Sequence, residues 1–495
     1  MTNSESFDVI ETTIADIHGA YRSGALSARQ LVETYLARID AYDQKGPAIN
    51  SVISLNPQAL EEADRLDAAY EAGPVGPLHG IPIIIKDQAD VSGMPTTMGS
   101  VLFKDYMPDQ DAFVAAKLKK AGAIFLGKAT LGEMGGGDTH GSLFGSTRNV
   151  YDLERTAGGS SGGSAASVSA NFCTVAVGQE GFASIRRPSI WNGVAGMRPT
   201  AGLVSRTGVL SGWPSVAGSL GPMSRTVTDL AKLLDCMVGY DPEDPLTARG
   251  FGIAPDSYAS DLDADALKGA RIGIVREPLA RDSEPDSDDF NKVAEVFDRA
   301  VADLRNAGAE LVDPITIPDV AALLAKRSED AELSEQSFEH YLARSANPPY
   351  GSLADLMASP LLDKVTKQTH DRLHRSKPPE ANHASMKARE LLMTRLLQVM
   401  ADHRLDAIVH KAVEHQPTRI EDGIKPPYVS AKGVPHINTF LVFVPSVVVP
   451  AGFTTDNLPA GITFLGRPYD DANMIRFAYA YEQATRHRLT PSCIL

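Results

Sequence analysis

The sequence predicts a large α/β protein, and two observations support this fold class. Between Leu78 and Tyr240, short apolar runs alternate with glycine-containing turns and with helix-like segments. Such an alternation is typical of a sheet with parallel strands that is flanked by helices. Hydrophobic residues make up 43% of the 495 residues, which is enough for a sizeable core and too much for wholesale disorder. We therefore expect a central mixed, mostly parallel β-sheet flanked by helices.

Residues 1–75 are predicted to form an N-terminal helical layer. Ser27 and Gln30 match a capping box, and apolar residues then recur at the helical spacing. A second amphipathic helix is expected over residues 59–71, because Gly73 and Pro74 follow it and would end it. No motif here indicates chemistry, so we interpret the segment as a packing layer.

Residues 76–245 are predicted to form the core of the fold, and residues 246–315 to continue it. In the core, strands are expected at residues 81–85, 123–126 and 174–177, and helices at residues 111–120, 161–170 and 227–238. In the continuation, strands are expected at residues 270–275 and 310–312, on either side of a helix at residues 289–306. We expect the whole chain to form one large domain.

The last two segments complete this domain. Residues 316–404 are charged and helical, which fits either a variable cap at the entrance of a site or a solvated helical lobe. Residues 405–495 are expected to return to the core sheet, with buried strands in the apolar stretch 440–453. Pro445 and Pro450 interrupt that stretch, which is also too short to span a bilayer.

The composition favours a soluble cytoplasmic enzyme. A formal net charge of −15 and a pI near 5.3 argue against unaided binding to nucleic acid or to an anionic membrane. The N-terminus lacks a basic region followed by an apolar stretch, so no signal peptide is expected. Cys173, Cys236 and Cys493 are odd in number and far apart in the sequence, which favours a reduced compartment.

Three residues in separate segments are candidates for acyl-transfer chemistry. Lys86 ends the apolar run at residues 81–85, Ser160 lies in a glycine- and serine-rich stretch, and Ser184 follows further on. Amide hydrolysis needs an activated nucleophile and hydrogen-bond donors that face the developing oxyanion. A lysine can act as the base when burial disfavours its charged form. Glycine-rich turns let main-chain N–H groups approach a substrate closely.

Each of these features has a simpler explanation when it is taken alone. The stretch 158–164 could be a flexible Gly/Ser linker, Lys86 a surface lysine at a strand end, and Ser184 an ordinary turn serine. A Walker A phosphate loop is excluded because no Gly-Lys-Ser/Thr follows the glycines. The presence of all three features in this order favours a catalytic site.

These segments resemble the amidase-signature family of serine hydrolases, which use a Ser–cisSer–Lys triad. Further blocks resemble the family, among them DQADVSGMPTTMGS at residues 87–100 and NGVAGMRPTAGLVSRTG at residues 192–208. The resemblance implies the amidase-signature fold, with Ser184 as the nucleophile, Ser160 as a bridging serine in a cis peptide and Lys86 as the terminal base. It also implies that neither a metal nor an organic cofactor is required.

The resemblance extends to groups around the nucleophile. The N–H groups of the implied oxyanion hole are those of Gly181, Phe182, Ala183 and Ser184. Positions expected near the substrate are Met134, Gly135, Phe182 and Arg187. The family usually has two glycines where this chain has Phe182 and Ala183, which narrows the backbone freedom of the loop and adds an aromatic ring.

The run GQEGFASIRRPS resembles the branch that contains aryl acylamidases and urethane-cleaving hydrolases. The expected function is therefore an amidase, a hydrolase of linear amides, that acts on aryl acylamides or on related amides or carbamates (urethanes). The expected partner is a small-molecule amide or carbamate, with no nucleic acid and no membrane, and homodimers are common in the family.

Several alternatives stay open at this stage. The chain could be the glutamine-hydrolysing subunit of a tRNA amidotransferase, or a catalytically inactive binding paralogue. A Ser-His-Asp triad is the rival mechanism, because 12 histidines are available, although no Gly-x-Ser-x-Gly elbow surrounds Ser184. His370 and His374 have the spacing of metal ligands on a helix, but the Glu of a zinc-protease motif is missing, so we expect solvated histidines.

Overall fold

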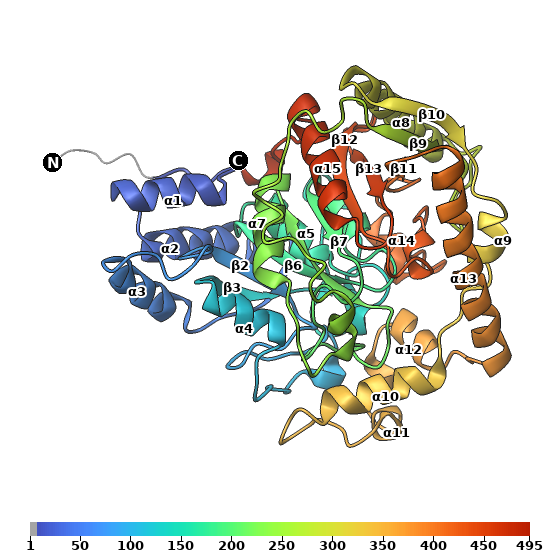
Figure 1. Cartoon of the computed structure of the whole chain (residues 1–495). Helices are drawn as coiled ribbons and strands as arrows, with labels where there is room; N and C mark the ends of the chain where they lie inside the picture. Colours follow the sequence, from blue (N-terminus) through green and yellow to red (C-terminus); the bar gives the residue numbers. More distant parts are fainter. Residues whose placement is uncertain (1–6) are drawn as a thin grey trace.

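The computed structural model describes residues 7–495, and within them one large sheet crosses the molecule (Figure 1). Its eleven strands follow the order β1-β3-β2-β6-β8-β7-β12-β13-β11-β9-β10. The strands are β1 (Val52–Leu55), β2 (Pro82–Lys86), β3 (Ile124–Ala129), β6 (Val175–Glu180), β7 (Ala195–Arg198), β8 (Ser219–Ser224), β9 (Arg271–Val275), β10 (Glu310–Ile315), β11 (Ala407–Lys411), β12 (Ser446–Phe453) and β13 (Pro459–Leu465). A separate small hairpin pairs β4 (His140–Gly141) with β5 (Gly145–Ser146).

The sheet is mixed, as predicted, and its parallel pairs lie in two blocks. In one block β2 pairs in parallel with β3 and β6, and in the other β9 pairs in parallel with β10 and β11. Between these blocks, the pairs from β6 through β8, β7, β12 and β13 to β11 are all antiparallel. The α/β fold class is confirmed, while the expected parallel arrangement holds for the two blocks and not for the strands between them.

Helices cover the sheet and extend from it on two sides (Figure 1). They are α1 (Ile14–Ser23), α2 (Ala28–Arg38), α3 (Ala59–Tyr70), α4 (Phe113–Lys120), α5 (Gly162–Ser169), α6 (Arg186–Trp191), α7 (Val227–Met237), α8 (Asp288–Asn306), α9 (Val320–Leu324), α10 (Ala331–Leu342), α11 (Leu353–Met357), α12 (Lys367–Leu373), α13 (Pro379–Asp402), α14 (Ile420–Ile424) and α15 (Asp471–Thr485). The helices α7, α8 and α15 pack on the middle strands, and α5 and α6 pack on the same part of the sheet.

Helices α2 and α3 form as the sequence predicts, but β1 in the same predicted helical layer joins the main sheet, and residues 1–6 of that layer lie outside the described residues. Ser27 caps α2 in a capping box, in which its hydroxyl accepts the N–H of Gln30 at 3.2 Å and the Gln30 side chain accepts the N–H of Ser27 at 2.9 Å. Such reciprocal bonds satisfy two donors that a helix start leaves free. The helices α1 to α3 lie together at one end of the molecule, on the left in Figure 1.

The predicted strands at residues 440–453 are only partly present. The strand β12 begins at Ser446, directly after Pro445, and residues 440–445 of the predicted stretch form no strand. Proline has no N–H to donate and restricts the residue before it, so the ladder starts after it. Pro450 is tolerated inside β12 because the pairing of this strand with β7 ends at Val448, and a bulge follows.

The helices α9 to α13 form the region predicted as a cap or a solvated lobe, at the right and bottom of Figure 1. The face of α10 that points to the core is apolar, and the rings of Phe338 and Phe103 lie 6.4 Å apart. The Tyr341 hydroxyl donates to Asp90 at 2.8 Å. This region is therefore packed onto the core through its inner face. No helix of residues 7–495 has the length and apolar character that a membrane crossing needs.

The carboxyl of Glu482 on α15 joins that helix to α7. Its Oε1 accepts the N–H of Val227 at 2.8 Å, at the first residue of α7. Burial raises the pKa of Glu482 to about 8, and the charge of Asp229 adds to this rise. A carboxyl whose pKa is higher in the folded chain than in the unfolded chain favours folding most when it is protonated.

Replacing Glu482 with Gln is expected to raise the melting temperature, and to raise it more at about pH 8 than at about pH 5. The wild-type chain loses stability as the pH rises from the unfolded pKa, 4.5, towards the folded pKa, about 8, because ionisation is costly in the fold. Glutamine keeps an acceptor for the N–H of Val227 and removes the charge. Thermal unfolding of both proteins at the two pH values measures this, and an equal shift at both would contradict the assignment.

Candidate active site

Lys86 is the last residue of β2, in the middle of the parallel block β3-β2-β6. Its side chain is completely buried, and Nζ lies 2.7 Å from Oγ of Ser160 and 3.2 Å from the carbonyl oxygen of Gln179. Burial lowers the pKa of Lys86 well below its usual value, against an opposing effect of Glu180. Neutral lysine is thereby favoured, which is the form that can accept a proton.

A second buried lysine next to it shows the opposite arrangement. Lys128 on β3 is also fully buried, and its Nζ forms an ion pair with Asp87 at 3.0 Å. It also donates to the hydroxyl of Thr96 at 3.0 Å. Within residues 7–495, Lys86 has no such carboxylate partner. Of these two buried lysines, one therefore has a carboxylate partner and the other has none within the described residues.

Ser160 and Ser184 are joined through the residue between Ser160 and α5. The peptide bond Gly159–Ser160 is cis, as the resemblance implied. The N–H of Ser161 donates to the carbonyl oxygen of Ser184 at 3.0 Å, which links the two serine segments. Ser184 keeps 8% of its surface exposed, whereas Lys86 and Ser160 keep none. The fold thus brings the three predicted residues together, with Ser184 on the solvent side.

Close packing of α5 places Ser160. Every residue of α5 is buried, and most of them are small. A Cβ at Gly163 would overlap the side chain of Thr130 and two backbone oxygens, so only glycine lets α5 approach this closely. The glycine- and serine-rich stretch is therefore a packed helix start and not a flexible linker.

A buried ion pair closes the loop of residues 181–184. The carboxylate of Glu180 accepts the N–H groups of Ile185 at 2.9 Å and Arg186 at 3.0 Å, and also Nε of Arg186 at 2.7 Å. Burial opposes ionisation, but Arg186 and Arg198 hold the pKa of Glu180 below its usual value. In the described chain, no loop or side-chain acceptor takes the N–H groups of residues 181–184. These donors are available for an oxyanion.

Arg187 was predicted to lie near the substrate. In the structure, its side chain contacts other parts of the protein. Its Nε donates to the carbonyl oxygen of Gly159 at 3.0 Å, and its Nη2 donates to that of Gly137 at 3.1 Å. Its Nη1 pairs with Asp138 at 3.0 Å, and both side chains are buried. Arg187 thus fixes the peptide before Ser160 and leaves little room for a carboxylate of a substrate.

The loop around Met134 and Gly135 lies between the core and α12. The N–H of Gly132 donates to the carbonyl oxygen of Ser160 at 3.0 Å, so this loop contacts the site directly. From the other side, Nη2 of Arg372 donates to the carbonyl oxygens of Glu133 at 2.9 Å and Met134 at 3.3 Å. Sequence reasoning missed Arg372, because its partners lie far away in the chain and no local motif marks it.

The carboxylate of Glu133 strengthens this junction. It accepts both the N–H and the hydroxyl of Thr366 at 2.7 Å, at the start of α12. A carboxylate at a helix N-terminus satisfies free N–H groups there. Helix α12 of the outer region is therefore bound to the loop that contacts Ser160.

Replacing Arg372 with Gln is expected to move the acid limb of the kcat/KM profile to higher pH, by up to about one unit. The charge of Arg372 lowers the pKa of Lys86, so its removal makes the lysine harder to deprotonate. Arg372→Lys keeps the charge and should keep the limb near its wild-type position. The two pH profiles measure this, and a uniform loss of activity with an unmoved limb would show that Arg372 acts through packing alone.

The ring of Phe182 lies between two groups from distant segments. Its centroid is 3.6 Å from that of the His436 ring and 4.1 Å from the guanidinium carbon of Arg327. Burial, together with nearby arginines that include Arg327 and Arg187, lowers the pKa of His436 to about 2. His436 is therefore neutral, and Phe182 is fixed by these contacts.

The histidines do not support the rival mechanisms. In the part of the chain that the structure describes, no histidine forms a hydrogen bond with Ser184, and the pair His415–Asp289, at 2.7 Å, lies elsewhere. The rings of His370 and His374 stack on each other at 4.2 Å at the end of α12. No group of three or more His, Cys, Asp or Glu side chains within residues 7–495 is arranged to hold a metal ion.

Comparisons with known proteins agree with this geometry. Residues 30–475 match the family model described as Amidase. One subunit of the glutamyl-tRNA(Gln) amidotransferase of Geobacter metallireducens is 33% identical over 500 residues, which are 97% of this chain and 98% of that protein. The solved structure of the native peptide amidase from Stenotrophomonas maltophilia superposes with a TM-score of 0.80 at 32% identity, covering 97% of this chain and 98% of that one.

The structure of a bacterial aryl acylamidase of the amidase signature enzymes superposes with a TM-score of 0.77, covering 96% of each chain. Its identity is 24%, so this likeness concerns the fold alone. The matched region includes Lys86, Ser160 and Ser184 and extends over most of the sequence. The chain belongs to the amidase family.

Proposed function

We propose that the protein hydrolyses amide bonds through an acyl-enzyme on Ser184, with Ser160 and Lys86 as its proton relay. The observation that carries this proposal is the buried Lys86, which lacks an acidic partner within residues 7–495 and lies 2.7 Å from the Ser160 hydroxyl. A neutral lysine at this distance is a base that can draw a proton through the serine. The presence of all three residues of the proposed relay also argues against an inactive paralogue.

The steps follow from the positions of these groups. Lys86 accepts the proton of Ser160 while Ser160 accepts that of Ser184, and Ser184 Oγ then attacks the carbonyl carbon. The N–H groups of residues 181–184 hold the oxyanion. The protons return through the relay to the nitrogen of the leaving amine as the C–N bond breaks. Water, deprotonated by the same relay, then cleaves the acyl-enzyme and releases the acid. These steps call for neither a metal nor an organic cofactor.

Aryl acylamides, or the related carbamates, are the proposed substrates. Phe182 supports this preference, because its N–H is one of the proposed oxyanion donors and its ring is held beside the nucleophile loop by Arg327 and His436. Apolar surface of an aryl group that is buried there would gain about 25 cal/mol per Å2. The homodimer and the cytoplasmic setting expected from the sequence stay predictions.

A second candidate function follows from the relatives. The similarity to the amidotransferase protein of Geobacter metallireducens over nearly the whole chain favours a glutamine-hydrolysing component of a larger assembly. Phe182 and Ala183, in place of the usual two glycines, speak against a site for so small and polar an amide. The peptide amidase, with similar identity and coverage, shows that likeness at this level does not separate the two functions.

A panel of four substrates tests these functions. Wild type and Ser184→Ala are assayed with an aryl acetamide, an aryl carbamate, a primary aliphatic amide and glutamine. We expect Ser184-dependent turnover led by the aryl acetamide or the carbamate. Turnover of glutamine alone would favour the amidotransferase function. Absence of any Ser184-dependent turnover by the folded protein would contradict the proposed hydrolase.

A further inference from the structure

Three arginines from separate segments lie near one another, and one of them contacts the ring of Phe182, beside His436. The guanidinium of Arg327, just after α9, lies over the Phe182 ring at 4.1 Å. Ala280 forms an antiparallel β-bridge with Pro435, the residue before His436, which brings the segment of Arg281 near that of His436. The charges of Arg327 and Arg281 both lower the pKa of His436, so both lie close to it.

Arg375, just after α12, is the third member of this cationic cluster. Burial lowers the pKa of Arg327, the charge of Glu329 opposes this, and the charges of Arg375 and Arg281 add to the lowering. All three arginines are nevertheless exposed to solvent. Arg327, which contacts Phe182, therefore lies beside the loop of the proposed nucleophile and still reaches water.

The carboxylates near the cluster form their ion pairs with lysines. The nearby carboxylate of Glu329 pairs with Lys377 at 2.9 Å, and that of Glu284 pairs with Lys432 at 2.8 Å. Within residues 7–495, the guanidinium groups of the three arginines form no ion pair and no hydrogen bond. In a chain with a net charge of −15, three unpaired cations at one point are a concentrated positive field.

We propose that this cluster binds a carboxylate carried by the amide substrate, with Arg327 as its main contact. The inference rests on the proposed function and adds a charge requirement to it. A guanidinium that stacks on an aromatic ring keeps its edge donors free, and these fit the two oxygens of a carboxylate. Since Phe182 is two residues before Ser184, an anion at Arg327 would anchor a substrate whose amide lies at the nucleophile.

Two matched substrate pairs test this charge requirement. One pair carries the charge on the amine side: 4-acetamidobenzoate and 4-acetamidobenzamide, both followed by release of acetate. The other carries it on the acyl side: N-phenylsuccinamate and N-phenylbutanamide, both followed by release of aniline. We expect the anionic member of at least one pair to be preferred in kcat/KM by about tenfold or more, as is usual for hydrogen bonds to a charged group. Added salt should reduce this preference.

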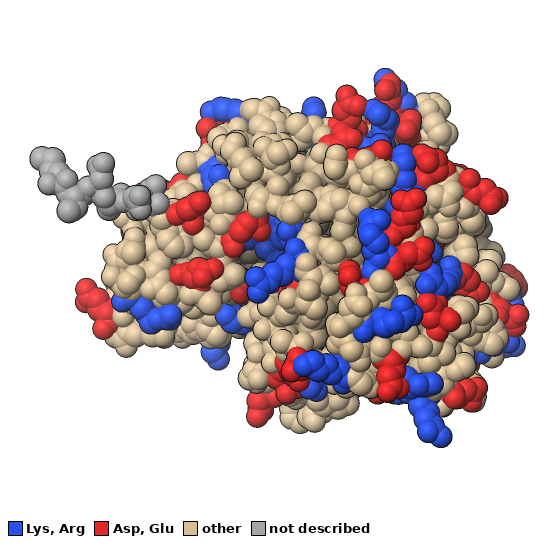
Figure 2. Space-filling view, turned by 90° about the horizontal axis from the view of Figure 1, so that it is seen from above, with Lys and Arg blue, Asp and Glu red and all other residues tan. Residues whose placement is uncertain are grey.

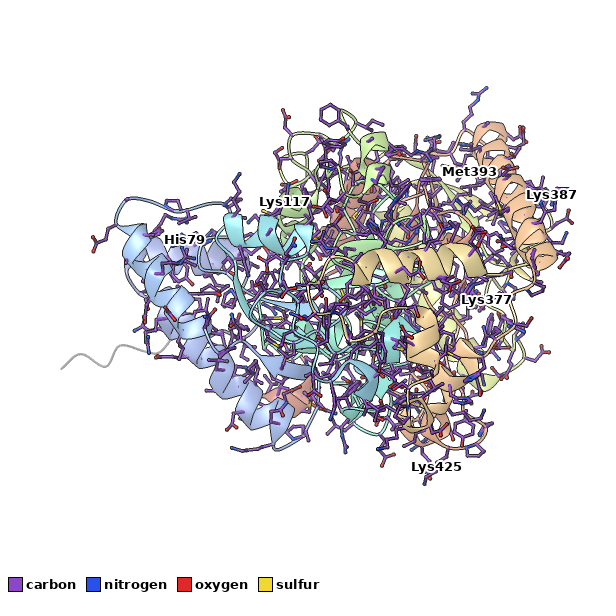
Figure 3. The ribbon with its side chains drawn as sticks, turned by 90° about the horizontal axis from the view of Figure 1, so that it is seen from below. His79, Lys117, Lys377, Lys387, Met393 and Lys425 are labelled. Carbon is purple, nitrogen blue, oxygen red and sulfur yellow. The ribbon has the colours of Figure 1, made fainter. Side chains whose placement is uncertain are left out.

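Substitutions then assign the preference to the cluster. Arg327→Gln should reduce the anionic-to-neutral ratio by about tenfold, mostly through KM, while Arg327→Lys should keep part of it. Arg375→Gln should reduce the ratio less. Lys387→Gln removes another exposed cation, on α13 (Figure 3), and should leave the ratio unchanged.

The outcomes separate this inference from the proposed function. A wild-type enzyme that hydrolyses the neutral members equally well, with a ratio that Arg327→Gln does not change, would overturn the carboxylate site and leave the hydrolase standing. Absence of Ser184-dependent turnover for all four compounds would overturn the proposed hydrolase, and the carboxylate site with it. If Lys387→Gln lowers the anionic-to-neutral ratio as much as Arg327→Gln does, the preference depends on the overall charge of the protein. This result would contradict the proposed carboxylate site.

Discussion

Replacing Lys86 with Met is expected to lower kcat/KM by about 10²- to 10⁴-fold and to leave the fold intact. In the proposed relay Lys86 is the base, and its burial favours the neutral amine. Methionine has a similar length and is apolar, so it suits the same buried position at the end of β2. Activity on an aryl acetamide and thermal unfolding, measured on the same preparation, check the two parts of this result.

Lys128→Met is the matched control for this substitution. Lys128 is equally buried but pairs with Asp87, so its replacement leaves a carboxylate buried without its partner. Breaking such a pair costs about 3–5 kcal/mol of stability. We therefore expect Lys128→Met to lower the melting temperature strongly and Lys86→Met to change it little. Near-wild-type turnover by folded Lys86→Met would contradict the relay.

Arg186→Met is expected to destabilise the protein by about 3–5 kcal/mol and to abolish most of its activity. Arg186 is the closest cation to the buried Glu180, while Arg198 lies at 4.0 Å. Without Arg186, Glu180 would lose the partner that offsets its burial, and the loop of residues 181–184 would lose the bond that closes it. Unfolding by denaturant, together with kcat/KM, measures both effects.

A surface arginine gives the control. Arg29 on α2 also contacts two carboxylates, Glu33 at 3.0 Å and Asp64 at 2.5 Å, but its side chain is 42% exposed. Exposed pairs of this kind contribute little to stability, so Arg29→Met should hardly change stability or activity. A similar loss in both variants would show that burial is not the reason for the effect at Arg186.

Sequence reasoning located the three residues of the proposed relay from their joint presence in this order and from the resemblance to the amidase-signature family, while local patterns predicted the elements next to two of them. An apolar run that ends in Lys86 becomes the buried strand β2, and small residues after Ser160 become the buried helix α5. The capping box at Ser27 is local as well, and it formed as predicted. Such features depend on a few neighbouring residues, whose conformational preferences can be judged from the sequence.

The features that sequence reasoning missed depend on contacts between distant segments. Arg372 donates to the carbonyl of Glu133 across 239 positions, and Arg187 turns to Gly159 and Asp138 rather than to a substrate position. The antiparallel pairing of the middle strands likewise joins β7 to β12 from distant parts of the chain. The hydrophobic periodicity of the sequence does not predict such pairings, because tertiary packing determines them.

The distribution of charge is a further feature that sequence reasoning could not predict. The composition gives a net charge of −15, and the face in Figure 2 shows basic and acidic side chains intermixed. The unpaired arginines of the cluster near Phe182 come from three segments that only the fold brings together. Net charge therefore argued against polyanionic partners but could not indicate a local site for a small anion.

The most direct test of the account is the detection of an acyl-enzyme on Ser184. Wild-type protein is mixed with an aryl acetamide, quenched in acid within the first turnovers, and measured as intact protein and as digested peptides by mass spectrometry. We predict an added acetyl group on the peptide that contains Ser184, and none in Ser184→Ala. Turnover with no acetylated Ser184, or an acetyl group on another residue, would contradict the proposed mechanism.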